Sequence, residues 1–335
     1  MQSKQRICSG LPKEELTMLQ RAPSHERITE AAGVINADLL HTRVRHDRAL
    51  DAAIGAHVLL KDETSGPIGC FKGRGTAYLV GRGVAPGVEL VCASAGNFGQ
   101  GLALAGTARG HQVTVFAATT ANPFKIERMR GLGADVKLAG ADFDAANAAA
   151  KAYAAANPMA RYIEDGDSAE VAEGAGTIAR EMTEAGLAFE AIFVPIGDGA
   201  LANGIGTWLR HARPGCKVIG VCATGAPALH SSWHSGRLVE TASANTIAEG
   251  IACRVPVAYA VTHLARTLDD CVLVSDAAMI AAMRMIHETL GLAVEPSAAC
   301  VVAAMLDMKG RLPATVAGVL SGGNLTAEQR RRWLG

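Results

Sequence analysis

The chain has 335 residues, 49% of them hydrophobic and only 4% aromatic, so it is long enough for two domains with cores built mainly from aliphatic side chains. Its 32 basic and 32 acidic residues cancel, and no basic stripe stands out, which excludes nucleic acid and anionic membranes as expected partners. The sequence has no apolar leader and no run of 18 apolar residues, so we expect a cytoplasmic protein that neither leaves the cell nor spans a membrane.

Regular patterning begins at His25, after a polar arm over residues 1–24 that we expect to be loosely ordered. Short β-branched runs then alternate with Ala-rich stretches, which predicts parallel strands wrapped by helices. The predicted strands are Val58–Leu60, Glu89–Ala93, Gln112–Ala117, Asp135–Leu138, Arg161–Ile163, Ala191–Pro195, Lys217–Cys222, Cys271–Val274 and Thr315–Leu320. The predicted helices include Gly99–Arg109, Pro123–Leu132, Asp142–Ala156 and Ala277–Leu290.

Cysteine and histidine spacing gives no metal signature. The eight cysteines form no C-x-x-C pair, so we expect buried, reduced thiols, with Cys70 of interest because it lies two residues before Lys72. The ten histidines are dispersed and form no H-E-x-x-H motif, and we predict no metal site.

One lysine stands among glycines in Gly69–Gly75, after a strand-like run and ahead of a predicted helix. Lys72 could form a Schiff base with an aldehyde cofactor, for which its pKa would have to be lowered by partial burial or by a nearby cation. A solvated surface lysine is the ordinary alternative, and it is the better interpretation of this segment taken alone.

Three further segments favour the cofactor-binding role of Lys72 over that of a solvated surface lysine. The four together are 61–75, 94–101, 195–201 and 321–325. In order and spacing they resemble the fold-type II pyridoxal phosphate (PLP) enzymes, the tryptophan synthase β family, and most of all the threonine/serine dehydratases and serine racemases. The resemblance covers roughly Glu26–Asn324. It implies an α/β fold with two parallel or mostly parallel twisted sheets wrapped by helices, in which a small domain (88–167) is inserted into a larger PLP-binding domain (1–87 and 168–335).

By this resemblance Lys72, with Phe71 beside it, holds PLP, and the lysine amine moves the substrate α-proton. The segment from Gly197 to Leu201 resembles the family's phosphate loop, in which backbone N–H groups at a helix start hold the phosphate. The predicted phosphate-loop residues are Gly197, Asp198, Gly199, Ala200 and Leu201. Asp198 departs from the usual glycine, and because a carboxylate repels phosphate we expect its side chain to point away. A plain strand-to-helix turn is the alternative for this loop.

The segment from Ser94 to Phe98 resembles the loop that binds the substrate carboxylate, through Ser94, Ala95, Gly96, Asn97 and Phe98. The resemblance also places the Asn97 side chain on the cofactor's 3-hydroxyl, whereas capping of the following helix is its structural alternative. Phe98 stands where many relatives carry histidine, which makes the pocket more apolar. Serine racemases carry a second serine where this chain has Ala95, so the resemblance favours one-sided chemistry.

Ser321 resembles the serine that meets the pyridine nitrogen, although a serine in a Gly-rich turn is also an ordinary turn residue. A hydroxyl does not force that nitrogen to be protonated, which favours elimination over routes through a long-lived carbanion. The segment Glu295–Ala298 resembles a stretch lining the same pocket. Glu249 lies where some relatives arrange a cation, but a surface carboxylate is an equal alternative, and no metal is predicted there.

These features predict a PLP-dependent dehydratase (ammonia-lyase) that converts a β-hydroxy-α-amino acid to a 2-oxo acid and ammonia. L-Threonine, L-serine and L-phenylserine remain open as substrates, as do hydroxyaspartate or a hydroxyectoine-derived acid, threonine synthase-like or β-replacement chemistry, and an inactive PLP-binding protein. The family implies a homodimer or homotetramer. Because the sequence ends soon after Asn324, we expect no C-terminal regulatory domain.

Overall fold

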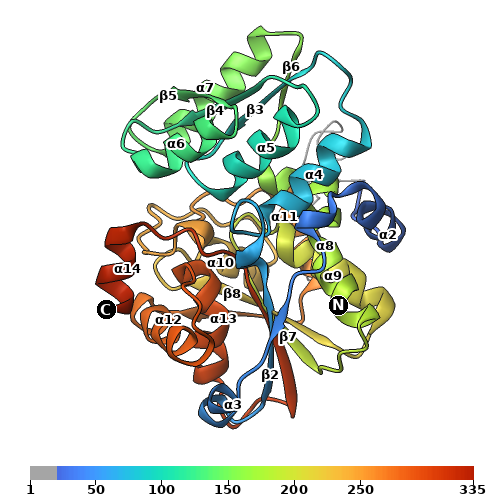
Figure 1. The fold of residues 1–335 in the computed structure, drawn as a ribbon, viewed down its shortest axis with the longest axis vertical. Helices are drawn as coiled ribbons and strands as arrows, with labels where there is room; N and C mark the ends of the chain where they lie inside the picture. Colours follow the sequence, from blue (N-terminus) through green and yellow to red (C-terminus); the bar gives the residue numbers. More distant parts are fainter. Residues whose placement is uncertain (1–20) are drawn as a thin grey trace.

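The structure is a computed structural model that describes residues 21–335. Cys8 and residues 1–20 of the predicted arm lie outside the described residues. It has a mixed α/β architecture with two sheets wrapped by helices, which confirms the predicted fold class. Figure 1 shows the two sheets at opposite ends of the molecule, joined by the segments that carry α4, α5, α8 and α9.

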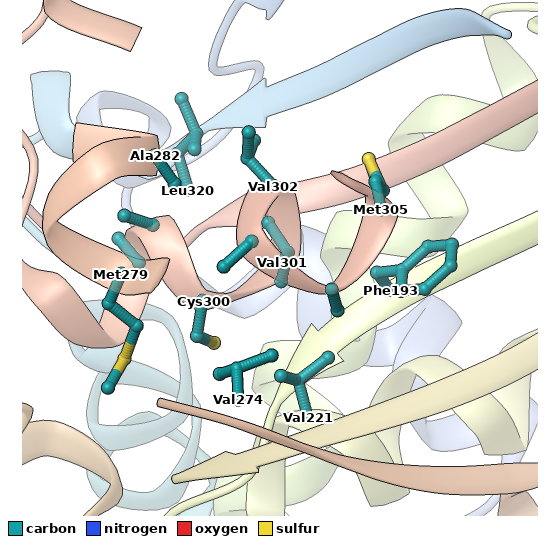
Figure 2. Packing of buried hydrophobic residues seen from close by; sticks show 14 of the residues in the cluster. Phe193, Val221, Val274, Met279, Ala282, Cys300, Val301, Val302, Met305 and Leu320 are labelled. Atoms are coloured by element: carbon teal, nitrogen blue, oxygen red, sulfur yellow. The ribbon is translucent and has the colours of Figure 1, made fainter. Parts of the chain in front are cut away.

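The strands of the six-stranded sheet lie in the order β1-β2-β10-β7-β8-β9. Only β1 is antiparallel to its neighbour. Its strands are β1 Val44–Arg45, β2 His57–Asp62, β7 Ala191–Pro195, β8 Lys217–Ala223, β9 Asp270–Val274 and β10 Thr315–Leu320. Both faces are covered, as the near-continuous apolar strands require. Figure 2 shows Val301 and Met305 of the helix over one face packed against Phe193 and Val221 of the strands.

The four-stranded sheet has the order β5-β4-β3-β6, and all its pairs are parallel. Its strands are β3 Glu89–Ala93, β4 Val113–Ala117, β5 Asp135–Leu138 and β6 Ala160–Tyr162. All four lie within residues 88–167, the stretch for which the sequence predicts the inserted domain; the division into domains stays a prediction. Figure 1 shows α6 and α7 with this sheet.

The remaining elements are helices. The α-helices are α2 His25–Val34, α3 Arg48–Ile54, α4 Lys72–Gly83, α5 Asn97–Thr107, α6 Pro123–Gly131, α7 Phe143–Ala156, α8 Ala169–Glu184, α9 Ala200–Ala212, α10 Ala228–Ser235, α11 Ala258–Thr267, α12 Asp276–Leu290, α13 Pro296–Asp307 and α14 Ala327–Leu334. Short 3-10 helices are η2 Ala37–Leu39, η3 Glu63–Ser65, η4 Asp165–Asp167 and η5 Glu249–Ile251. No helix among the described residues has the length and apolar character needed to cross a membrane.

The predicted strands and the four named helices agree with the structure to within one or two residues at each end. The largest shift among the helices is that of α5, which begins and ends two residues earlier than predicted. The sequence does not predict β1, which has only two residues and so carries no periodic pattern.

Helices α4, α8 and α9 pass so close that their backbones touch through glycines. A Cβ added to Gly204 of α9 would lie 1.9 Å from the Ala172 carbonyl oxygen of α8, and one added to Gly174 would lie 2.5 Å from the Arg74 carbonyl oxygen of α4. A Cβ on Gly75 would meet the Val171 carbonyl oxygen at 2.6 Å. No larger residue fits at these three positions without moving one helix from the next.

Candidate active site

The four segments singled out in the sequence meet where strands end. Segments follow the carboxyl ends of β2, β3, β7 and β10, the edge at which parallel α/β sheets bind ligands. Two backbone contacts tie the first and last segments together, because the Phe71 N–H donates to the Ser321 carbonyl and the Gly323 N–H donates to that of Gly69.

Lys72 is the first residue of α4, and its side chain is 14% exposed. Its ammonium pairs with the carboxylate of Asp165, in the turn after β6. The ring centroids of Phe71 and Phe98 lie 4.9 and 5.9 Å from Lys72 Nζ. The amine therefore lies among one carboxylate and two aromatic rings.

The lowering of the Lys72 pKa that Schiff-base formation requires is not found in this structure. Burial lowers the pKa of Lys72, but the Asp165 and Asp198 carboxylates outweigh it, and the net shift is upward. Asp165 comes from a segment 93 residues away and belongs to none of the four motifs. Only its place after a strand of the parallel sheet could have drawn attention to it.

Asp165→Asn should lower the pKa of Lys72, because it removes the carboxylate that holds the ammonium charged. An amine captures an aldehyde only when neutral, so capture should begin at lower pH. Following PLP capture by the cofactor-free protein across pH, by visible absorbance, should show a profile moved to lower pH. Asp167→Asn, on an exposed side chain two residues along, should leave the profile in place. An equal shift in both variants, or none in the first, would refute the role of Asp165.

Asp198 lies beside the segment that carries Asp165. A Cβ added to Gly166, the next residue after Asp165, would lie 3.1 Å from the Asp198 Cβ. Burial and the charge of Asp165 raise the pKa of Asp198 to about 7. Near neutral pH part of the Asp198 population is therefore uncharged, which weakens the repulsion between this side chain and a phosphate.

Asn97 joins two distant segments. Its Nδ2 donates to Glu295 Oε2 at 2.9 Å, and its Oδ1 accepts from Asn324 Nδ2 at 2.7 Å. Asn324 Oδ1 in turn accepts from Arg128 at 2.5 Å. The N-cap of α5 is Gly96, with no side-chain cap, so the capping alternative for Asn97 is wrong. Glu295 is 8% exposed and burial raises its pKa.

Three helices that start at the site have no side-chain cap: α4 after Phe71, α5 after Gly96 and α9 after Gly199. Helices α8 and α12 are capped by Ser168 and Ser275, whereas α10, α11 and α13 also lack a side-chain cap. Uncapped first-turn N–H groups bind anions, and Gly199 at φ 91° lets the loop turn into α9. The residues present thus offer a buried amine and open helix starts, a donor set that fits an anionic aldehyde cofactor.

The other predicted site residues lie at the same strand ends. Ser94 and Ser321 are buried, and Ser94 Oγ accepts from the Gly96 N–H at 3.2 Å. Ala95 is half-buried beside them. Ala200 and Leu201 point their side chains into the core, so only their backbone is available to a ligand.

Two residues noted in the sequence take other roles. Glu249 pairs with Lys125 of α6, so its carboxylate is engaged rather than open to a cation. Burial raises the pKa of the Cys70 thiol to about 12, which leaves it protonated and unreactive at neutral pH.

A buried ion cluster behind Lys72 has no signal in the sequence. Arg74 is 1% exposed and binds Glu63 through two parallel hydrogen bonds of 2.8 and 2.9 Å. Arg74 Nη1 donates to Glu181 at 2.5 Å, and Nη2, which also binds Glu63, donates to it at 3.1 Å. Glu181 also accepts from Lys61 at 2.5 Å. Two cations and two anions are thus paired out of water, with Arg74 in the first turn of α4.

The family model described as pyridoxal-phosphate dependent enzyme matches residues 36–322 of this chain. The chain belongs to the pyridoxal-phosphate dependent enzymes. The resemblance read from the four segments is thereby confirmed, PLP is the cofactor, and the protein is a PLP-dependent lyase of the amino acid dehydratase type.

Named relatives and solved structures agree. The L-threonine ammonia-lyase of Geobacter sulfurreducens is 32% identical over 303 residues, 89% of this chain and 75% of that protein. The biosynthetic L-threonine dehydratase of Escherichia coli is 30% identical over 325 residues, 95% of this chain but 61% of the relative. Maize serine racemase gives a TM-score of 0.87 at 26% identity, covering 93% of this chain and 97% of that one.

Proposed function

We propose that this enzyme is a dehydratase of β-hydroxy-α-amino acids, releasing a 2-oxo acid and ammonia. The observation that carries the proposal is the place of Lys72 at an uncapped helix start, beside the uncapped starts of α5 and α9. The ammonia-lyase and dehydratase names of the relatives support the same reaction.

In this proposal each predicted residue has a task. Bound PLP supplies the electron sink that stabilises negative charge at the substrate α-carbon. The first-turn N–H groups of α9, with Gly197 and Gly199, hold its phosphate, and Ser321 meets its ring nitrogen. Ser94 and the N–H groups that start α5 bind the substrate carboxylate. The Lys72 amine takes the α-proton, the β-hydroxyl departs, and the resulting enamine hydrolyses to the 2-oxo acid and ammonia.

Ala95 supports one-sided proton transfer. An alanine methyl at the position where racemases carry a second serine offers no proton donor or acceptor. Racemisation needs a group on each face of the α-carbon, so this chain should release 2-oxo acid without D-amino acid. Chiral chromatography of the reaction mixture would reveal any D-enantiomer.

The aromatic pair beside Lys72 makes phenylserine a specific candidate along with threonine and serine. Phe98→His should lower the ratio of kcat/KM for L-phenylserine over that for L-serine by roughly tenfold or more, because an apolar contact to the substrate ring is lost. Phe124→His, on an exposed phenylalanine of α6, is the matched control. An unchanged ratio in a folded Phe98→His protein would show that this ring does not select the side chain.

The test of the function is a panel of L-threonine, L-serine, L-phenylserine and hydroxyaspartate given to the holoenzyme, with detection of 2-oxo acid. Saturable release from one of the first three supports the proposal and ranks the substrates. Release from hydroxyaspartate alone would mean that the substrate is a dicarboxylic amino acid. Bound PLP with no turnover of any of the four would favour an inactive PLP-binding protein. A homodimer or homotetramer is part of the proposal, to be read from light scattering.

A further inference from the structure

Two histidines and an aspartate converge far from the active site, although nothing in their spacing suggested it. His46 Nε2 lies 2.9 Å and His57 Nδ1 3.0 Å from the same oxygen, Asp51 Oδ2. The three potential ligand atoms all lie within 4.8 Å of one another. Three donors of the types that bind transition metals therefore point at one small region.

The cluster is held by backbone structure. The other Asp51 oxygen accepts from the Val58 N–H at 2.8 Å, which fixes the carboxylate plane. Gly55, at φ 82°, ends α3 and turns the chain so that His57 returns beside Asp51. Leu50 and Ile54 are fully buried and anchor the helix that carries the aspartate. Little rearrangement is needed to use these donors together.

The cluster is open to solvent. The side chains of His46, Asp51 and His57 are 38%, 24% and 46% exposed. In the part of the chain that the structure describes, the ion-pair partners of Asp51 are these two histidines, with no lysine or arginine among them. An ion can enter, and water can take the position that the protein leaves open.

We propose that His46, Asp51 and His57 form a binding site for a divalent transition-metal ion, for which Zn²⁺ is the best match. Zn²⁺ binds imidazole nitrogen and carboxylate oxygen at about 2.0–2.2 Å in tetrahedral geometry, which sets neighbouring ligand atoms roughly 3.3–3.6 Å apart. The two contacts to Asp51 are only slightly shorter, so a small outward shift of the imidazoles admits the ion. Two histidines with one carboxylate and a water complete its coordination.

The ion would fasten α3 to the start of β2 and leave the chemistry untouched. Five residue steps of strand, about 16 Å, separate His57 from Asp62 at the other end of β2, where the strand leads toward the active site. Figure 1 shows α3 at the end of the molecule opposite the four-stranded sheet. The site is thus structural, and its occupancy should raise thermal stability because the ion binds only the folded arrangement.

The test titrates chelator-treated holoenzyme with Zn²⁺ by calorimetry and with Co²⁺ by visible absorbance. We expect one saturable ion per chain, a raised unfolding midpoint with Zn²⁺, and an unchanged kcat. His46→Ala with His57→Ala should abolish the binding, and Asp51→Asn should weaken it by at least about tenfold, the loss that follows even when only a supporting partner is removed.

His230→Ala is the matched control, because His230 lies 4.3 Å from the ring of His234 in another histidine pair that lacks the carboxylate. It should bind Zn²⁺ as the parent does. Three outcomes would overturn the proposal: no saturable binding to the parent, binding retained by the double histidine variant, or Co²⁺ spectra with the strong charge-transfer absorption of thiolate ligands. None of these three outcomes depends on turnover, so they test the metal site independently of the proposed dehydratase activity.

Discussion

Lys72→Ala should abolish covalent attachment of PLP and lower kcat for 2-oxo acid release by at least roughly 10²- to 10⁴-fold, the usual contribution of a positioned proton-transfer group. The amine pairs with Asp165 and lies near the rings of Phe71 and Phe98. The visible absorbance of the purified protein measures attachment, and an oxo-acid assay measures turnover.

Lys309→Ala provides the control, because this lysine lies on the loop after α13, outside the site. It should keep both colour and activity. A Lys72→Ala protein that stays yellow after dialysis would mean that another amine holds the cofactor, and the assignment of the site would fall with it. Loss of colour with folding intact, checked by circular dichroism, separates attachment from stability.

Arg74→Leu should destabilise the protein by about 3–5 kcal/mol, because the buried carboxylates of Glu63 and Glu181 lose the guanidinium that compensates them. Urea unfolding would measure the loss. Arg74 lies in the first turn of α4, so the same change should also weaken PLP retention. Arg74→Lys, which keeps the charge but not the two parallel bonds to Glu63, should fall between parent and Arg74→Leu.

Arg82→Ala on the same helix is the control, because Arg82 is 32% exposed and pairs with Glu30 at 3.2 Å on the surface. Arg82→Ala should lower the free energy of unfolding by less than about 1 kcal/mol. Equal stabilities of the two variants would show that the cluster contributes nothing beyond a surface pair.

The cluster also predicts a pH dependence. Although burial opposes ionisation, Arg74 and Lys61 hold the pKa of Glu181 at about 2, below its ordinary value of 4.5. A lowered folded-state pKa gives stability that is complete above the unfolded value and disappears as pH falls through about 2. Acid unfolding of Glu181→Gln should lack this component of the pH dependence.

Sequence patterning predicted the sheets because buried parallel strands read as continuous apolar runs, and these runs place the strands directly. The same logic placed Ser94, Gly197 and Ser321, since residues that follow such strands share one edge. It could not find β1, whose two residues form an antiparallel edge with no pattern of their own.

Long-range pairing is what the sequence could not supply. The sign of the Lys72 pKa shift depends on Asp165, which stands among other acidic residues in a turn and looks like a solvated carboxylate. The partners of Arg74 likewise come from η3 and α8, and nothing local distinguishes a buried arginine from an exposed one. The convergence of His46 and His57 depends on the turn at Gly55, which a list of histidine spacings does not reveal.

The glycine contacts among α4, α8 and α9 limit how this enzyme can change. PLP has a fixed covalent length, so the atom that holds its aldehyde end and the groups that hold its phosphate end must keep one separation. In the proposed site those two attachment points begin α4 and α9, and α8 lies against both with backbone touching backbone at Gly75, Gly174 and Gly204. At these three contacts any side chain larger than hydrogen would push the helices apart, so substitutions there cannot adjust that separation by small steps. We therefore expect new substrate preferences to arise at side chains outside these contacts, such as Phe98.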